Sequence, residues 1–399
     1  GNGDHQGSGR VGGDGVMAKL GDIATYINGY AFKPQDWSDE GIPIIRIQDL
    51  TGNSYQANRY NGEYASKYEV NDGDVLISWS ASLGVYVWHG EKAVLNQHIF
   101  KVVFDKERIS KDFFVHQVGL ILENAASDAH GATMKHLTKP VFDALPFYLP
   151  PYEKQCEIAE VLDKVMNLIS LRKQQLAKLD ELVKARFVKM FGDPISNPFG
   201  FKVESLQEML DDNAITYHLD GNHGSDYPRN EEFVESGVSY ISANCIIDDN
   251  VNLKLAKHLT EERAAKLRKG IAQDEDVLFA HNATVGPVAI LHTRETKVVL
   301  GTSLTAYRCN KQCILPSYLK AYMQSEGFVR QYTKDMKQTT RNQVPITAQR
   351  KYLFIVPPLS LQNQFAAFVE RVDQQKRTVQ QSLEKLELMK KALMQEYFG

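Results

Sequence analysis

The sequence predicts an α+β protein: two mixed α/β domains joined by two long antiparallel coiled-coil helices, arranged as a pseudo-two-fold internal repeat. Three observations favour this fold class. The chain has 399 residues, more than one ordinary domain of about 100 to 200 residues. A segment of 43 residues occurs twice, as residues 150–192 and 357–399. Both copies carry a heptad pattern of apolar residues, whereas short β-rich runs precede each of them.

The two copies of the long segment align without a gap at an offset of 207 residues, with thirteen identities in 43 positions. Pro150-Pro151 and Pro357-Pro358 mark the helix starts, where proline is tolerated, and Gly192 marks a stop. About 38 helical residues would span about 57 Å at 1.5 Å per residue. Ordinary core helices average about three turns, so we interpret both segments as coiled-coil helices.

A seam between the two helices is predicted from residues spaced alternately by three and four. It consists of Ile158, Leu162, Val165, Leu176, Leu179 and Val183 in the first helix and Phe365, Val369, Val372, Leu383, Leu386 and Leu393 in the second.

The segments before the helices also repeat each other, more weakly. The runs at residues 41–47, 74–84 and 94–99 correspond to 237–243, 276–286 and 299–304, with an offset that grows from 196 to 205 as loop insertions would produce. We expect strands at Ile42–Ile47, Val75–Ile77 and Ile99–Phe104, and helices near Asp112–Asn124 and Pro316–Asp335. The predicted limits are 17–149 and 193–356 for the globular domains and 150–192 and 357–399 for the helices.

Composition excludes several other classes of protein. With 43% hydrophobic and 24% charged residues, the chain is a globular protein rather than a disordered one. Apolar runs do not approach the roughly 18 to 20 residues that cross a bilayer. Four scattered cysteines do not form a disulfide scaffold or a zinc-ligand set, which favours a cytoplasmic protein without a metal. Residues 1–16, with seven glycines, are interpreted as an expression remnant before a native start at Met17.

Motifs for catalysis and phosphate binding are missing from the sequence. Leu149-Pro-Pro-Tyr152 is similar to the (Asn/Asp)-Pro-Pro-(Tyr/Phe) loop of amino-methyltransferases, but leucine cannot accept the hydrogen bond of the target amine. Neither a G-x-x-x-x-G-K-[ST] loop nor an H-E-x-x-H motif occurs. We therefore expect a chain that is not an enzyme and that binds no cofactor. Its net charge of −3 indicates that attraction to phosphates alone would not hold it on DNA.

Two dissimilar globular domains, each followed by a long helix that opens with Pro-Pro and ends with Phe-Gly, resemble the specificity subunit of type I restriction-modification systems. The resemblance covers Met17 to Gly399 and is most specific in the Pro-Pro-x-x-x-Gln helix starts and in the phrases Gly41-Ile-Pro-Ile-Ile-Arg46 and Gly73-Asp-Val-Leu-Ile-Ser78. The family usually has Glu-Gln where this chain has Lys154-Gln155 and Leu361-Gln362.

The resemblance implies that the globular domains are target-recognition domains on double-stranded DNA. It implies that the helices are spacers that dock two DNA adenine methyltransferase subunits and, through them, restriction subunits. S-adenosylmethionine is expected on the methyltransferase partner. Two antiparallel helices of equal length would relate the domains by a pseudo-two-fold axis that matches the local dyad of duplex DNA, and the divergence of the domains predicts an asymmetric, bipartite target.

Polar loops in register between the two domains are the candidates for base contacts, because serine, asparagine, glutamine, arginine and lysine are side chains that bond base edges. Ordinary turn chemistry explains the same residues equally well. The candidates are Arg46, Gln48, Ser78, Ser80, Ser82, Asn96, Gln97, His98, Lys135 and His136 in the first domain and His281, Asn282, Thr284, Thr302, Ser303, Lys337, Thr339, Thr340, Arg341, Asn342 and Gln343 in the second. For Arg46, an inward salt bridge is an equal alternative.

Two functions from other classes stay open at this point. A structural adaptor could use the helical hairpin to join proteins without DNA, and a stand-alone regulator could bind DNA by itself. The nearly neutral charge counts against the regulator, which would usually need its own basic surface.

Overall fold

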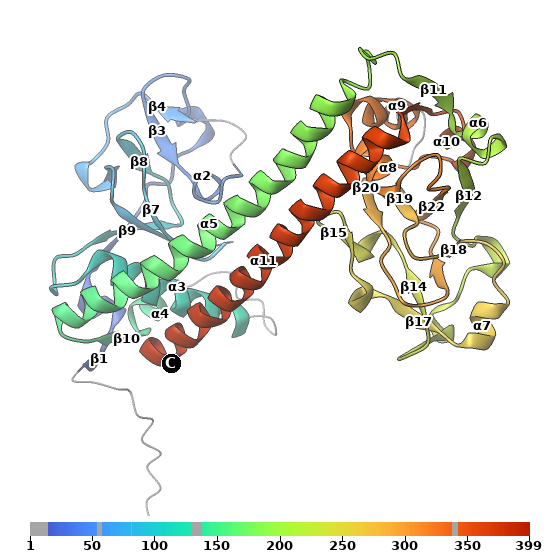
Figure 1. The fold of residues 1–399 in the computed structure, drawn as a ribbon. Coiled ribbons are helices and arrows are strands. Elements are labelled where there is room, and N and C mark those ends of the chain that lie inside the picture. The colour runs from blue at the N-terminus through green and yellow to red at the C-terminus, as the bar shows by residue number, and fades with distance from the viewer. Residues whose placement is uncertain (1–14, 54–57, 81, 129–137, 337–341) are drawn as a thin grey trace, which may run out of the picture. The chain divides into compact units, whose positions relative to one another are not determined.

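The computed structural model describes residues 15–53, 58–80, 82–128, 138–336 and 342–399 (Figure 1). The chain divides into two compact units. Unit 1 contains the residues up to Lys173 together with Gln381–Gly399, and unit 2 contains Gln174–Gln380. Because both long helices contribute residues to both units, the predicted domain limits stay predictions.

The described residues of unit 1 form two four-stranded sheets and one two-stranded sheet. The first sheet is antiparallel in the order β2 (Thr25–Asn28), β9 (Ile99–Val103), β6 (Val75–Ser78), β7 (Gly84–Val87). The second has the order β4 (Arg59–Tyr60), β3 (Ile42–Ile45), β8 (Ala93–Leu95), β5 (Glu69–Val70), with β3 and β8 parallel. Strands β1 (Val16–Lys19) and β10 (Pro146–Leu149) pair separately. The helices before the long one are α1 (Leu20–Ile23), α2 (Ile47–Leu50), α3 (Lys111–Asp128) and α4 (Lys139–Asp143).

Unit 2 has the same plan with additional strands. One sheet has the order β12 (Ile215–Asp220), β22 (Leu304–Cys309), β19 (Val277–Asn282), β20 (Thr284–Ile290), β16 (Asn250–Val251), β15 (Ile246–Ile247). The other has the order β13 (Phe233–Val234), β17 (Lys257–Leu259), β14 (Val238–Ile241), β21 (Val298–Leu300), β18 (Ile271–Ala272). Strands β11 (Lys202–Ser205) and β23 (Leu353–Val356) pair separately. The shorter helices are α6 (Leu206–Asp211), α7 (Glu261–Ala265), α8 (Pro316–Met323), α9 (Glu326–Met336) and α10 (Ile346–Gln349).

The internal repeat predicted from the sequence is confirmed element by element. The order β2-β9-β6-β7 recurs as β12-β22-β19-β20, and the parallel pair β3·β8 recurs as β14·β21. The starts of corresponding strands, such as Ile42 with Val238 and Val75 with Val277, have the offsets seen in the sequence alignment. The two units are therefore two copies of one fold.

The two long helices are α5 (Tyr152–Phe191) and α11 (Leu359–Phe398), each beginning directly after its proline pair (Figure 1). Gly192 ends α5 with a φ of 76°, in the left-handed region, and a Cβ there would collide with Pro198. Glycine adopts this conformation without steric cost, which explains the stop.

Within unit 1, the start of α5 packs beside the end of α11. Ile158 and Leu162 are buried in a cluster that Leu393 and Phe398 also contact. Further along, Arg172 Nε donates to Ser382 Oγ at 3.2 Å. Residue numbers rise along α5 as they fall along α11, so the helices are antiparallel.

Within unit 2, the end of α5 packs beside the start of α11. Phe187 and Phe191 both lie against Phe365, with ring centroids 5.8 and 5.5 Å apart. A smaller cluster of Leu179, Val372 and Val379 continues the contact. All twelve residues of the predicted seam are buried or half-buried in their own units.

The glutamine of each Pro-Pro-x-x-x-Gln motif is buried and anchors the start of its helix. Gln155 Oε1 accepts from Ser110 N at 2.9 Å, and its Nε2 donates to Pro150 O at 2.9 Å. Gln362 does the same with Leu315 N at 2.9 Å and Pro357 O at 2.9 Å. In each case the glutamine joins the carbonyl of the first proline to the backbone N–H of the residue just before α3 or α8, so it ties the start of its long helix to that neighbouring helix and is structural.

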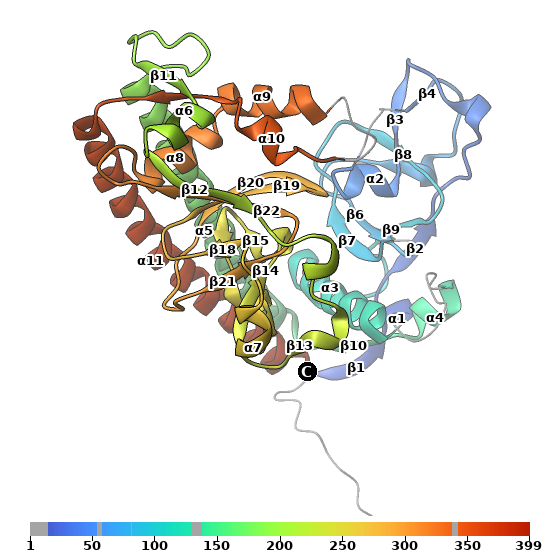
Figure 2. The same ribbon diagram turned by 90° about the vertical axis from the view of Figure 1, so that its right-hand side faces the viewer.

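Some sequence-based expectations need correction. The single helix expected at Pro316–Asp335 is two helices, α8 and α9, separated at Gln324–Ser325 (Figure 2). Helix α9 packs on β19 through the rings of Phe328 and Phe279. Strand β1 begins at Val16, so the segment 1–16 that we set aside includes one strand residue. Residues 1–14 of that segment lie outside the described residues.

Candidate nucleic-acid interface

Two candidate loops of unit 1 meet at one end of its first sheet. The segment after β6 lies beside the turn between β8 and β9, because Trp79 N donates to His98 O at 3.3 Å. Gln97 N donates to Tyr30 O at 2.8 Å, and His98 has a φ of 71°, which bends the chain sharply. The structure therefore brings the segment after β6 and residues 96–98, two separate groups of candidates, close together.

Two of the serines in these loops do not face solvent. Ser78 is fully buried and its Oγ donates to Ser80 O at 3.2 Å, while Ser80 is 5% exposed. A hydroxyl without solvent contact cannot reach a base edge in this conformation, so Ser78 and Ser80 are not proposed for base contacts and their role stays a prediction. Ser82 is exposed, and Asn96, Gln97 and His98 are half-buried.

Arg46 adopts the inward arrangement that the sequence left open. Its Nε lies 3.6 Å from Asp49 Oδ2, its side chain is 14% exposed, and its guanidinium lies 5.9 Å from the centre of the Trp37 ring. Gln48 is half-buried, and one orientation of its amide oxygen accepts from the Arg46 guanidinium at 3.1 Å. The two residues therefore support the loop after β3 from inside.

The candidate loops of unit 2 also lie next to each other, and a third segment, residues 342–344, lies beside them. Residues 342–344 lie along the tip of the β19–β20 hairpin: Ala283 N donates to Asn342 O at 3.0 Å and Val344 N donates to His281 O at 2.8 Å. His281 N in turn donates to Ser303 O at 2.9 Å. Thr284 and Asn342 are exposed, whereas Asn282, Thr302, Ser303 and Gln343 are half-buried.

His281, a candidate for base contacts, is buried below this tip, so its side chain does not reach solvent in this conformation. It is 1% exposed, and its Nδ1 lies 2.9 Å from Thr305 Oγ1. Burial lowers the pKa of His281 to about 4, so the ring is neutral at pH 7.

A chain of buried polar side chains continues from His281 into the core of unit 2, and sequence reasoning missed it. Gln349, which is fully buried, donates from Nε2 to Thr305 Oγ1 at 3.2 Å and to Val344 O at 3.3 Å. Its Oε1 accepts from Tyr307 Oη at 2.6 Å and lies 3.1 Å from His218 Nε2. Burial also lowers the pKa of His218 to about 4. These residues are far apart in sequence, so only the fold reveals the chain.

Six of the candidate residues for base contacts are not placed by the structure. Lys135, His136, Lys337, Thr339, Thr340 and Arg341 lie outside the described residues. Within the described part, Arg330 pairs with Glu326 on the same helix, and Arg350 Nη1 lies 3.5 Å from Gln207 Oε1. These two guanidiniums are therefore engaged with the protein itself.

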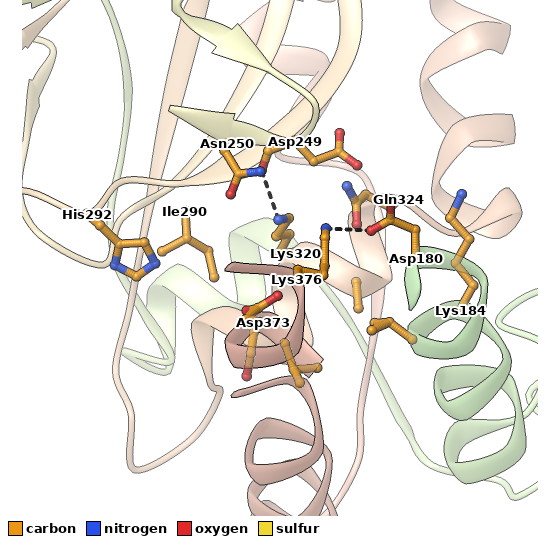
Figure 3. Close-up of a pocket in the computed structure, with 14 residues that line it drawn as sticks. Asp180, Lys184, Asp249, Asn250, Ile290, His292, Lys320, Gln324, Asp373 and Lys376 are labelled. Atoms are coloured by element: carbon orange, nitrogen blue, oxygen red, sulfur yellow. Dashed lines mark hydrogen bonds and ion pairs between the residues drawn. The ribbon is translucent and has the colours of Figure 1, made fainter. Parts of the chain in front are cut away.

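A polar pocket lies in unit 2 where α5, α8 and α11 meet the turn between β15 and β16 (Figure 3). Lys320 donates to Asp249 O at 2.9 Å, and Lys376 Nζ lies 2.6 Å from Asp180 Oδ1. The pocket also holds Lys184 and Asp373, so its formal charges cancel. Its lysines and aspartates are matched, which fits a structural contact of the helix pair with the domain.

The described residues lack two features that are typical of other protein classes. In that part of the chain, groups of three or more His, Cys, Asp or Glu that could hold a metal ion do not occur. The helices of the described ranges are too short or too polar to cross a bilayer.

Fold and loops together define a recognition protein built by duplication, with polar loops at corresponding ends of two similar units and a pair of long helices. The family described as type I restriction modification DNA specificity domain matches residues 14–181 and 219–388, and the chain belongs to this family.

Individual relatives agree with this assignment. The chain is similar to the type I restriction enzyme EcoBI specificity subunit of Escherichia coli, with 22% identity over 88% of this chain and 77% of the relative. It is also similar to the MjaVIII specificity subunit of Methanocaldococcus jannaschii, with 22% identity over 96% and 92%. Its fold is similar to the crystal structure of the type I S subunit from M. genitalium, with a TM-score of 0.57, 14% identity, and coverage of 97% and 96% of the two chains.

Family membership decides between the functions that the sequence left open. The chain is a DNA-specificity subunit of a type I restriction-modification system, a DNA-recognition component that is not itself catalytic. The adaptor without DNA gains no support from any relative.

Proposed function

We propose that each unit reads one half of an asymmetric, bipartite DNA target. The observation that carries this proposal is the recurrence of polar loops at one end of the corresponding sheets, beside β6–β7 in unit 1 and β19–β20 in unit 2. Residues at equivalent positions differ in type: Ser82 of unit 1 occupies the position of Thr284 of unit 2, and Gln97 that of Thr302. Different side chains on one scaffold favour two different half-sites.

Base contacts are proposed for the candidates that reach solvent, namely Ser82, Asn96, Gln97 and His98 in unit 1 and Asn282, Thr284, Thr302, Asn342 and Gln343 in unit 2. The six candidates outside the described residues stay predictions.

Partner proteins are proposed to dock on the long helices. Val161, Leu168 and Leu171 of α5 are 38%, 43% and 49% exposed and lie outside the seam. Their spacing of seven and three residues places them on one helix face. Exposed apolar residues gathered on one face are typical of protein interaction surfaces, so this α5 strip is proposed to bind a methyltransferase subunit.

The proposed complex contains two DNA adenine methyltransferase subunits and, through them, restriction subunits, in the cytoplasm. S-adenosylmethionine would be bound by the methyltransferase, and this chain would supply neither a cofactor site nor a catalytic group. Its own contribution is the choice of the DNA site.

The proposal is tested by co-expressing the full chain with its methyltransferase subunit in a host without adenine methylation and sequencing the methylome. We expect one bipartite motif with two different halves, and no methylation when either protein is expressed alone. Methylation without a defined motif, or a motif in one block, would contradict the proposal.

A further inference from the structure

Four equivalent positions lie below the candidate base-contact loops of the two units. They hold aromatic side chains in unit 1 and hydrogen-bonding polar side chains in unit 2. In unit 1 the four positions are Tyr26, Phe142, Phe100 and Trp79; in unit 2 they are His218, Gln349, Thr305 and His281. Strand register fixes the equivalence, because Tyr26 pairs with Val102 as His218 pairs with Tyr307.

The unit 1 version is a continuous group of aromatic rings. Tyr26 meets Phe142 edge-on at 4.8 Å, Phe142 meets Phe100 at 5.3 Å, and Phe100 stacks on Trp79 at 5.6 Å with an angle of 22° between the rings. Trp79 is the first residue after β6 and therefore connects this group to the loop above it. These ring contacts hold the loop mainly by shape and buried area, and Trp79 Nε1 adds one hydrogen bond to Asn28 Oδ1 at 3.1 Å.

The unit 2 version is a directional chain of hydrogen bonds. Gln349 Oε1 can only accept, so Tyr307 Oη and His218 Nε2 donate to it, which places the His218 proton on Nε2. Gln349 Nε2 can only donate, so Thr305 Oγ1 accepts from it, and the same hydroxyl lies 2.9 Å from His281 Nδ1. The Gln349 amide thus fixes the direction of its own bonds to Tyr307, His218 and Thr305.

The hydrogen-bond chain is connected to the candidate base-contact loops of unit 2 through two backbone contacts. Gln349 Nε2 also donates to Val344 O, and Val344 N donates to His281 O, so Gln349 holds the segment 342–344 directly and the hairpin tip through Val344. Gln349 and Thr305 are fully buried, so neither can touch DNA directly.

We propose that Gln349 and Thr305 are positioning residues for the half-site read by unit 2, holding Asn282, Asn342 and Gln343 in register with the bases through the hydrogen-bond chain. The proposal rests on the proposed reading of one half-site by each unit. A shift of about 1 Å in a positioned group is enough to lose a bidentate base contact, and each such contact discriminates strongly against the wrong base.

The experiment compares Thr305→Val with Thr305→Ser in the full complex with the methyltransferase subunit. Valine keeps the shape but lacks the hydroxyl, whereas serine keeps the hydroxyl. Methylation rates are measured on duplexes that carry the cognate site or one mismatch in either half. We expect Thr305→Val to lower the discrimination against mismatches in one half-site about tenfold or more, with the other half unchanged, and Thr305→Ser to retain it.

A control separates positioning from general stability. Leu319 is fully buried in the core of the same unit and takes no part in the hydrogen-bond chain of Gln349 and Thr305. Leu319→Ala should lower the melting temperature at least as much as Thr305→Val, yet leave discrimination unchanged. If Thr305→Val does not fold, Gln349→Met replaces it in the same assay with the same expected result. Methionine lacks the amide but has about the same length as glutamine.

Three outcomes would overturn the inference: unchanged discrimination in Thr305→Val, equal relaxation of both half-sites, or the same relaxation in Leu319→Ala. These outcomes differ from a failure of the proposed function itself, in which the wild-type complex would methylate no bipartite site.

Discussion

The ring of Phe398, the next-to-last residue, packs against the ring of Phe113 in α3, with centroids 5.5 Å apart. In unit 2, Phe191 at the end of α5 meets Tyr318 of α8 at 4.8 Å. Phe113 and Tyr318 hold equivalent positions, as do Phe398 and Phe191. Each unit is thus completed by the end of the helix that starts from the other repeat, which is what an antiparallel pair requires.

The chain is expected to tolerate circular permutation, because both of its ends lie in unit 1. Strand β1 pairs with β10, directly before α5, and Phe398 packs on α3 of the same unit. A short linker from Gly399 to Val16, with new ends between Ile195 and Ser196, interrupts no helix or strand. We expect unchanged folding and an unchanged methylated motif. Loss of folding, or a different motif, would show that the antiparallel arrangement is wrong.

Burying a charge in the helix seam is expected to destabilise the protein. Leu383 is 5% exposed, so Leu383→Asp should lower the free energy of unfolding by about 3 to 5 kcal/mol. Leu176→Asp, in the half-buried part of the seam, should act in the same direction. Leu388, which is 68% exposed on the same helix, provides the control: Leu388→Asp should change stability by less than about 0.5 kcal/mol. Denaturant unfolding measures all three, and equal values for Leu383→Asp and Leu388→Asp would exclude the seam.

Stability of unit 2 should fall as the pH is lowered below 6.5. Burial holds the pKa of His218 and His281 at about 4, whereas unfolded histidine titrates near 6.5. Between these values the unfolded state binds more protons, so the free energy of unfolding decreases as pH falls, by up to about 2 kcal/mol for each histidine between pH 7 and 5. Asp220, Arg350, His223 and Lys269 are the charged or titratable groups that act on the two rings.

Melting curves at pH 7 and 5 test this dependence. The double variant His218→Gln and His281→Gln should show a smaller difference between the two curves. His89, whose side chain is 77% exposed, is the control, and His89→Gln should behave like the wild type. A double variant with the wild-type pH dependence would refute the assignment to these two histidines.

Methyltransferase binding should depend on the α5 strip. Introducing Leu168→Glu together with Leu171→Glu places two charges where an apolar contact is proposed, and should weaken binding at least tenfold without lowering the melting temperature. Ala177 is exposed on a different face of α5, so Ala177→Glu should bind normally. Equal binding by both variants in a titration of the methyltransferase subunit would show that the docking site lies outside the α5 strip.

Much of the architecture could be predicted from the sequence because the two copies of the repeat are still similar in sequence. The heptads of α5 and α11 and the corresponding phrases at Asp74–Gly84 and Asp276–Gly286 reflect local patterns that survive in the fold. The break between α8 and α9 was missed, because Gln324 and Ser325 carry no proline or glycine signal.

The candidate site was less predictable for a physical reason. Polar residue types indicate loops, but burial is set by tertiary packing, so Ser78, Ser80 and His281 could not be separated from Ser82 and Thr284 in advance. Gln349 shows the converse: a glutamine in a short helix is ordinarily exposed, but three of its buried contacts join it to strand residues more than forty positions away in the sequence.

Exchange of one unit's globular part tests most directly the central claim that each unit reads its own half-site. Residues 16–149 are replaced by the corresponding segment of a relative, with both long helices kept, and the methylome is sequenced in a host that carries the methyltransferase subunit. The account predicts that one half of the motif changes while the other half and the spacer length are retained. A change in both halves, or in the spacer, would contradict it.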